Sequence, residues 1–260
     1  VFVETSEDVL VAGITTNADV SLTSTAGSIL DNQADRINVS ASSLRFDANT
    51  GFGASSNAFD TQVGTVAGRT IDGAVFLQDS ADDLIIGSTQ ASSEVVAADS
   101  SITVNAVAPL SGIVSGGADG SIVVTQTTGS LTVDSAAPVS AAGSGNILLD
   151  AAGALALNAD VSSGSGNITL VGGNGLSIAS GVSTITGAGD IFMDAGIGAL
   201  LQSSTSTTAA GENVRLVATG DVTVAEVIAD KISVLSSANI ITAPGASLNL
   251  SASALRLDAG

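Results

Sequence analysis

The chain has 260 residues and a formal net charge of −19, and it contains no Cys, His, Trp or Tyr. Its 25 Asp and Glu outnumber six Lys and Arg, so binding to a phosphate backbone is disfavoured and nucleic acid is not an expected partner. The missing imidazole and thiol side chains exclude His- and Cys-based catalysis, soft-metal sites and disulfides. No apolar run approaches the roughly 20 residues of a membrane-spanning helix.

Apolar residues alternate with small or polar residues in short triplets, a pattern typical of β-strands. Gly, Asn, Asp or Ser bounds each triplet, and no stretch keeps the 3.6-residue period of an amphipathic helix. This placement favours an ordered all-β chain, even though few aromatic residues and a high net charge are typical of disorder. In chain order, the leading strands are expected to begin at Val1, Val20, Ile37, Val75, Ile102, Ile122, Ile147, Ile168, Ile191, Val214, Ile232 and Leu248.

These strand starts recur about every 22 residues, and further apolar segments follow within each period. Three short strands and three turns per period are typical of one coil of a parallel β-helix, whose core closes only when coils stack. The sequence therefore predicts a single continuous parallel β-solenoid over residues 1–260, with about 12 coils. Large rings are expected to jam its narrow interior, in agreement with an aromatic content of 2%.

Two stretches break this rhythm and are expected to form loop insertions, near 49–62 and 88–100. A longer repeat also exists, because residues 29–48 match 240–259 at 9 of 20 positions. We therefore treat 1–48 as equivalent to 214–260. Arg45 and Arg256 are copies at an outward strand position, which indicates a structural role. The chain opens in a strand and stops in a coil, which predicts a window of a longer array or a subunit of an end-to-end polymer.

Four polar residues precede the leading triplets of successive coils and are expected to form one column at a turn: Asn146, Asn167, Asp190 and Asn213. Two interpretations have equal weight. The side chains either hydrogen-bond to their stacked neighbours, or they reflect only the preference of Asn and Asp for turns.

Three phenylalanines, Phe2, Phe76 and Phe192, occupy the middle, outward position of an apolar triplet. Most coils have a small or polar residue there, and outward aromatic residues often mark a contact. They are expected to lie under a loop of the same chain or in an interface between fibres.

The carboxylates Asp79, Asp82 and Asp83 form the most concentrated acidic group. A solvated turn is the first interpretation; a weak calcium site and a pair of catalytic carboxylates are the alternatives. The acidic residues Glu4, Glu7 and Asp8 occupy the equivalent position of the repeat, and catalytic groups rarely occur twice in a tandem array. We therefore expect no catalysis and no cofactor, except for weakly bound calcium.

The triplet pattern, with phrases such as residues 145–158 (GNILLDAAGALALN), resembles the repeat region of filamentous-haemagglutinin-like exoproteins. Residues 51–63 are similar to a linker in giant members of that group. The resemblance covers most of the chain and implies a right-handed parallel β-helix, export to the cell surface or the extracellular space, and a role as a long adhesive fibre.

Together, these observations predict a structural segment of a giant extracellular filament or adhesin stalk, without catalysis. Self-association or end-to-end continuation into a fibre is expected. A β-helix module that binds a host or surface glycan through its loops is the alternative function, and a polysaccharide-degrading β-helix enzyme is the second.

Overall fold

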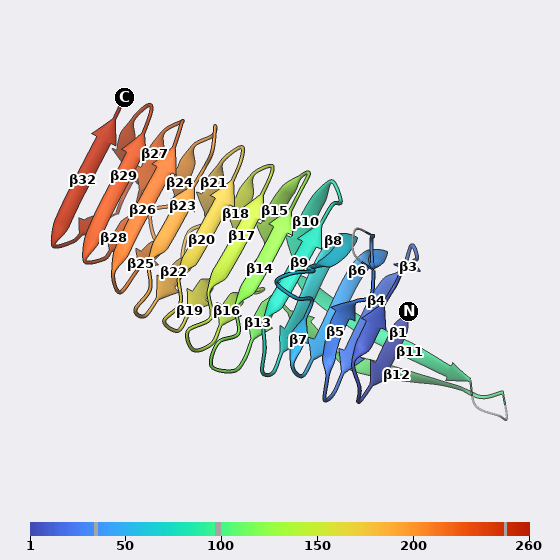
Figure 1. Cartoon of the computed structure of the whole chain (residues 1–260). Coiled ribbons are helices and arrows are strands. Elements are labelled where there is room, and N and C mark those ends of the chain that lie inside the picture. Colours follow the sequence, from blue (N-terminus) through green and yellow to red (C-terminus); the bar gives the residue numbers. More distant parts are fainter. Residues whose placement is uncertain (34–35, 97–99, 247–248) are drawn as a thin grey trace.

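The computed structural model describes residues 1–33, 36–96, 100–246 and 249–260 (Figure 1). These residues form strands and turns only, and the strands wind into a parallel β-solenoid of about 10 turns of roughly 23 residues. The predicted fold class is confirmed. Apart from β11 and β12, which form a separate two-stranded sheet, the strands hydrogen-bond to their counterparts in neighbouring turns, so the backbone ladders run along the length of the solenoid.

The solenoid has three sides, which we name A, B and C. Side A contains β1 (Phe2–Thr5), β4 (Asp19–Ser24), β13 (Ile113–Ser115), β16 (Val139–Ala141), β19 (Val161–Ser163), β22 (Ser183–Thr186), β25 (Thr207–Ala209), β28 (Glu226–Ile228) and β31 (Leu250–Ser251). Side B contains β2 (Val9–Val11), β5 (Ser28–Asp31), β7 (Gly51–Phe52), β9 (Val75–Asp79), β14 (Ile122–Gln126), β17 (Ile147–Ala151), β20 (Ile168–Gly172), β23 (Ile191–Asp194), β26 (Asn213–Ala218), β29 (Lys231–Ser236) and β32 (Ala254–Ala259). Side C contains β10 (Asp83–Ile86), β15 (Ser130–Val133), β18 (Leu155–Leu157), β21 (Leu176–Ile178), β24 (Leu200–Gln202), β27 (Val222–Val224) and β30 (Ile240–Thr242).

In the first turns of the solenoid, two long strands each cover more than one side. β6 (Val39–Ala48) pairs first with β3 (Ile14–Thr15) and then with β4. β8 (Phe59–Thr70) pairs with β10 of side C and with β13 of side A. These long strands therefore pass around the corner between sides C and A without a turn.

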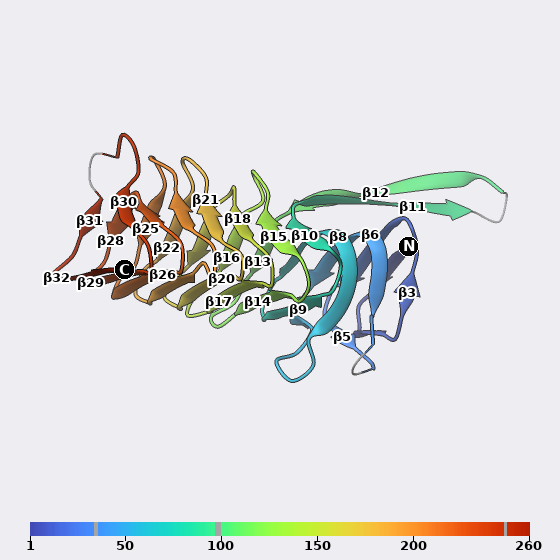
Figure 2. The ribbon, with the colours of Figure 1, turned by 90° about the horizontal axis from the view of Figure 1, so that it is seen from above.

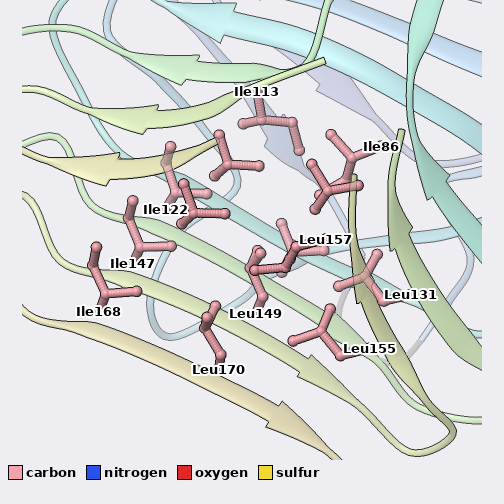
Figure 3. Packing of buried hydrophobic residues seen from close by; sticks show 14 of the residues in the cluster. Ile86, Ile113, Ile122, Leu131, Ile147, Leu149, Leu155, Leu157, Ile168 and Leu170 are labelled. Atoms are coloured by element: carbon pink, nitrogen blue, oxygen red, sulfur yellow. The ribbon is translucent and has the colours of Figure 1, made fainter. Parts of the chain in front are cut away.

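The core is a set of aliphatic columns that run through the solenoid (Figure 3). On side B, Ile122, Ile147 and Ile168 lie in register on successive strands, and all three are buried. Leu131, Leu155 and Leu176 form the matching column on side C. Alternate residues of each strand face this core, which explains why the sequence shows triplets with apolar first and third positions.

Large rings do occur in the interior, so the expectation that they would jam it was wrong. Phe46, Phe52 and Phe59 are fully buried. The Phe46 and Phe52 rings stack with centroids 3.9 Å apart, and Phe59 packs against Phe52 in a tilted arrangement at 4.5 Å. Gly68 lies beside the Phe46 ring, and a Cβ atom added there would collide with the ring. The small residue Gly68 in the next turn thus makes room for the Phe46 ring.

The count of about 12 coils was slightly high because the predicted strand starts do not lie in one column. Val20 stacks through Leu44 and Val66 on Ile86 of side C, whereas Val75 and Ile122 belong to side B. Ile37 precedes β6, and Ile102 begins a strand outside the solenoid. Leu248 lies outside the described residues.

The segment 88–100 lies mostly in a β-hairpin; its residues 97–99 are outside the described part of the chain. Strands β11 (Ser88–Val96) and β12 (Ile102–Ser111) pair antiparallel and leave the solenoid between β10 and β13. The hairpin folds back along the N-terminal turns, where β11 contacts β8, β6, β4 and β1 (Figure 2). Segment 49–62 contains β7 and the start of β8, joined by residues 53–58.

The two copies of the long repeat lie on different sides of the solenoid. Ile29 stacks in the side B column with Phe52 and Val75, whereas its copy Ile240 stacks on Val222 of side C. All three sides share the same pattern of apolar-in and polar-out residues, so one sequence unit fits any of them.

Candidate functional site

The predicted acidic group is divided between the inside and the outside of the solenoid. Asp79 is fully buried, whereas Asp82 and Asp83 are exposed at the following turn. The Oδ1 atom of Asp83 accepts a hydrogen bond from the Ser130 N–H at 2.8 Å. The structure therefore does not bring the three carboxylates together, and within the described residues no group of three or more Asp and Glu is arranged to hold a metal ion.

Asp79 instead organises a buried polar network at the corner between sides B and C. Its Oδ2 atom accepts hydrogen bonds from the Thr61 hydroxyl at 2.7 Å and the Val63 N–H at 3.0 Å. Its Oδ1 atom accepts from the Ala81 N–H at 2.8 Å and the Gln126 amide at 3.2 Å. Burial raises the pKa of Asp79, and these four hydrogen bonds oppose the rise. The network joins three successive turns.

The four residues of the predicted turn column lie at the corner between sides A and B and form a hydrogen-bonded ladder. The Asn146 side-chain oxygen accepts from the Asn167 N–H at 2.8 Å, and the Asn167 oxygen accepts from the Asp190 N–H at 2.9 Å. The Asp190 carboxylate accepts from both the backbone and the side chain of Asn213, at 3.0 Å and 2.7 Å. Each side chain thus ties its turn to the next.

A buried hydroxyl at the same corner was missed by the sequence analysis. The Ser163 hydroxyl donates to the Gly145 carbonyl at 2.7 Å and accepts from the Gly166 N–H at 2.9 Å. The Thr186 hydroxyl makes the same pair of bonds one turn later, to the Gly166 carbonyl and the Gly189 N–H. The signal was available as the phrase Ser/Thr-x-x-Gly-Asn/Asp before an apolar triplet, at 163–167 and 186–190.

The three outward phenylalanines are all half-buried, in different surroundings. Phe2 lies in one outward column with Ser21 and Arg45. Gly53 begins the connection formed by residues 53–58 and has a φ of +67°, which favours glycine. The carbonyl of Phe76 lies so close to Gly53 that a side chain there would collide with it. Phe192 lies beneath the Arg215 guanidinium, 5.8 Å from its ring centroid, at cation–π distance.

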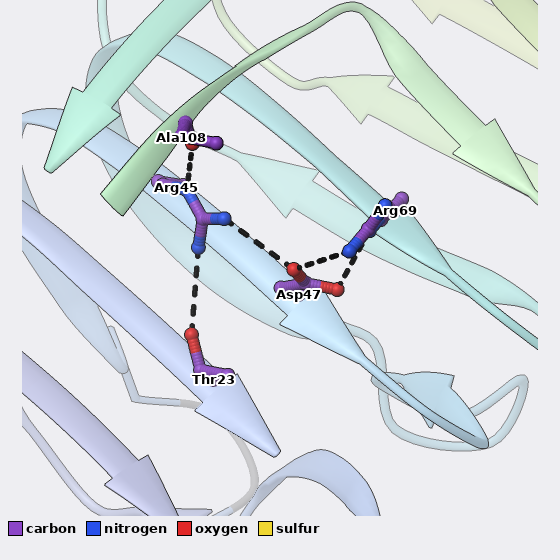
Figure 4. Close-up of polar contacts among 5 residues, drawn as sticks. All are labelled: Thr23, Arg45, Asp47, Arg69 and Ala108. Atoms are coloured by element: carbon purple, nitrogen blue, oxygen red, sulfur yellow. Dashed lines mark hydrogen bonds and ion pairs between the residues drawn. The ribbon is translucent and has the colours of Figure 1, made fainter. Parts of the chain in front are cut away.

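The hairpin covers Arg45, which forms a charged group with the largely buried Asp47 and the exposed Arg69 (Figure 4). The Arg45 Nε atom donates to the Ala108 carbonyl of β12 at 3.3 Å, and its other nitrogens reach Thr23 at 3.4 Å and Asp47 at 3.3 Å. Asp47 also accepts two hydrogen bonds from Arg69, at 2.9 Å and 3.0 Å. Arg45 is only 3% exposed, and this burial lowers the pKa of its guanidinium, while Asp47 opposes the change.

A groove of about 470 Å³ lies on the outer surface of side B, over β26, β29 and β32. Three of the chain's six cationic residues line it: Arg215, Lys231 and Arg256. Ser233 lies in register between Arg215 and Arg256, and Leu235 also lines the groove. Half of the cationic residues of a chain with a net charge of −19 therefore line this one groove.

A search for membrane-spanning helices finds none of sufficient length and apolarity in the described parts of the chain. In comparisons with known proteins, no family model, no curated protein and no solved structure matches the chain.

Proposed function

We propose that the chain is a structural segment of a long extracellular filament or adhesin stalk, and that it has no catalytic role. One observation carries this proposal: a single aliphatic core and unbroken parallel ladders run through about 10 turns. Stacked turns rise about 4.8 Å each, so the described solenoid forms a rod about 50 Å long. Each inner turn is held by backbone hydrogen bonds to the turns on both sides of it, and these bonds resist extension along the axis.

The family to which the chain belongs is a second part of the proposal. We propose kinship with the filamentous-haemagglutinin-like exoproteins, with export to the cell surface or the extracellular space. The solenoid fold and the phrase at residues 145–158 support this kinship. The acidic surface fits a fibre because like charge keeps neighbouring rods apart and soluble.

The function is tested by electron microscopy of native material that contains this chain. Continuous thin fibres support the structural proposal. Isolated short rods that degrade acidic polysaccharides would contradict it and favour an enzyme. A fibre-free preparation that binds defined sugars on a glycan array would instead favour the binding module.

A further inference from the structure

Side B has a wide outer face because its strands are long. The central strands β14, β17 and β20 have five residues each, and two residues of each strand point outward. Strands of the other sides, such as β16, β18 and β19, have three residues and one outward position. Two adjacent outward columns therefore run along side B and form a broad surface, which lies on the opposite side of the rod from the hairpin (Figure 2).

Most residues of these two columns between β14 and β29 are apolar. Each of them is half-buried by its neighbours on the same face, and the strands place them in register. The apolar residues are Val123, Leu148, Val171, Phe192, Val217 and Leu235. The face is therefore a continuous apolar surface in the middle of the solenoid.

The face contributes little to the charge of the chain. Its charged residues between β14 and β29 are Asp150, Asp194 and Arg215, which sum to −1, whereas the whole chain has −19. Most of the repulsion between two rods therefore arises from other parts of the surface, so two copies can approach most easily with their B faces together.

Asp150 lies near the middle of this face without a partner. The residues in register with it on β14 and β20 are Thr125 and Val171, so neither strand places a charged group opposite it. Among the described residues its carboxylate has no hydrogen-bond or ion-pair partner, whereas Asp194 accepts a hydrogen bond from the Gly196 N–H at 2.8 Å. Burial raises the pKa of Asp150. A surface placed over Asp150 would remove more of its water and would favour the neutral carboxyl further.

The size of the face fits a weak contact between two copies. Strands about 4.8 Å apart, each about five residues wide at roughly 3.3 Å per residue, give about 500 Å² from β14 to β29. Two such faces together bury about 1,000 Å², which is near the lower limit for a specific interface between proteins. A contact of this size is sensitive to one buried charge.

We propose that the outer face of side B joins two copies of this chain side by side, and that Asp150 makes this contact depend on pH. At neutral pH the ionised carboxylate would be buried without a partner, so it opposes the contact. In mild acid the protonated carboxyl has no charge, and the apolar faces associate. The inference rests on the proposed filament function and specifies how neighbouring rods form bundles.

Analytical ultracentrifugation between about pH 4.5 and pH 7.5 tests the role of Asp150. The wild-type chain should associate at least about tenfold more tightly at the lower pH. Asp150→Asn should associate at least about tenfold more tightly than wild type at pH 7.5. Asp82→Asn removes the same charge at an exposed turn and should behave as wild type. A wild-type chain that is monomeric at both pH values, or equal effects of the two variants, would overturn the proposal.

A charge added to the face tests its position. In the Asp150→Asn background at about pH 7.5, where glutamate is ionised, Val123→Glu should weaken association at least about tenfold. Ile185→Glu adds the same charge at an outward position of side A and should have little effect. Circular dichroism checks that both variants keep their strands. Equal losses, or a loss with Ile185→Glu alone, would contradict the assignment to side B.

Electron microscopy separates this inference from the filament function. Native fibres that stay single in mild acid would refute bundling through side B and leave the filament function standing. Purified chains that associate through side B, from a source without fibres, would refute the filament function and leave the contact standing.

Discussion

At the scale of residues, the interior of this solenoid tolerates polar groups only where neighbouring turns supply their partners. Asp79 has four donors, and three of them come from segments far along the chain: Thr61, Val63 and Gln126. A buried carboxylate without such donors would cost several kcal/mol, so the network determines which turns can be neighbours. The sequence analysis interpreted Asp79, with Asp82 and Asp83, first as part of a solvated turn, because carboxylates are rarely buried without partners.

The raised pKa of Asp79 makes a prediction about pH. Because the folded-state pKa lies above the unfolded value, folding favours the protonated carboxyl. Its contribution to stability is therefore fully present below the unfolded pKa of about 4 and is lost as pH rises through the higher folded pKa. Asp79→Asn should remove this part of the pH dependence.

Urea unfolding of both proteins between about pH 3 and pH 7 measures the effect. The difference in unfolding free energy between wild type and Asp79→Asn should change with pH. A pH-independent difference at Asp79 would show that its pKa is the same in the folded and unfolded chains.

At the scale of elements, the corner between sides A and B is the most regular part of the fold. The glycines of successive turns approach each other so closely that a Cβ atom on Gly166 would collide with the Gly145 carbonyl. The same contact recurs between Gly189 and Gly166. Glycine at this corner therefore allows two backbones to lie in contact, and the Asn and Asp ladder holds them in register.

Gly166→Ala should therefore destabilise the solenoid by about 2 kcal/mol or more, because backbone must move to admit the methyl group. Gly13→Ala is the matched control. Its added Cβ would meet nothing closer than the Ile37 carbonyl at 3.9 Å, and the change should cost less than about 0.5 kcal/mol. Denaturant midpoints measure the stability of both variants. An equal loss of stability in Gly166→Ala and Gly13→Ala would contradict the close-contact explanation.

The hairpin is the other element whose attachment can be tested. Arg45→Met keeps an aliphatic stem but removes the bonds to Ala108, Thr23 and Asp47, so it should cost about 1–2 kcal/mol and speed amide exchange in β12. Arg256→Met removes the exposed copy of the ion pair and should cost less than about 0.5 kcal/mol in the monomer. Unchanged exchange in β12 would mean that Arg45 does not hold the hairpin.

At the scale of the whole molecule, a net charge of −19 opposes a compact rod. The few cations are used locally, since Arg45, Arg69 and Arg256 each bond an aspartate two residues away or on the next strand. Most of the negative charge is therefore uncompensated along the surface, and ionic strength should control stability and lateral association.

Raising NaCl from about 10 mM to about 500 mM should increase the thermal midpoint by roughly 2–4 °C, because salt screens this repulsion. CaCl₂ at the same ionic strength should have the same effect if calcium acts only by screening. A larger increase with CaCl₂, measured by circular dichroism, would indicate specific calcium binding. A midpoint that falls with NaCl would contradict the repulsion argument.

The sequence alone determined the fold class, because a two-residue alternation inside a period of about 22 residues has one compact solution, a stack of three-sided coils. It also located the column from Asn146 to Asn213, since a turn residue must recur once per coil. Two features depended on the tertiary structure, because the sequence period contains no information about them: the side on which a strand lies, and the contacts of the inserted hairpin. Strands on all three sides have the same pattern, so only stacking determined which side Ile29 and Ile240 occupy. The burial of Arg45 depends on a hairpin inserted more than 40 residues later in the chain, and local pattern contains no information about such a contact.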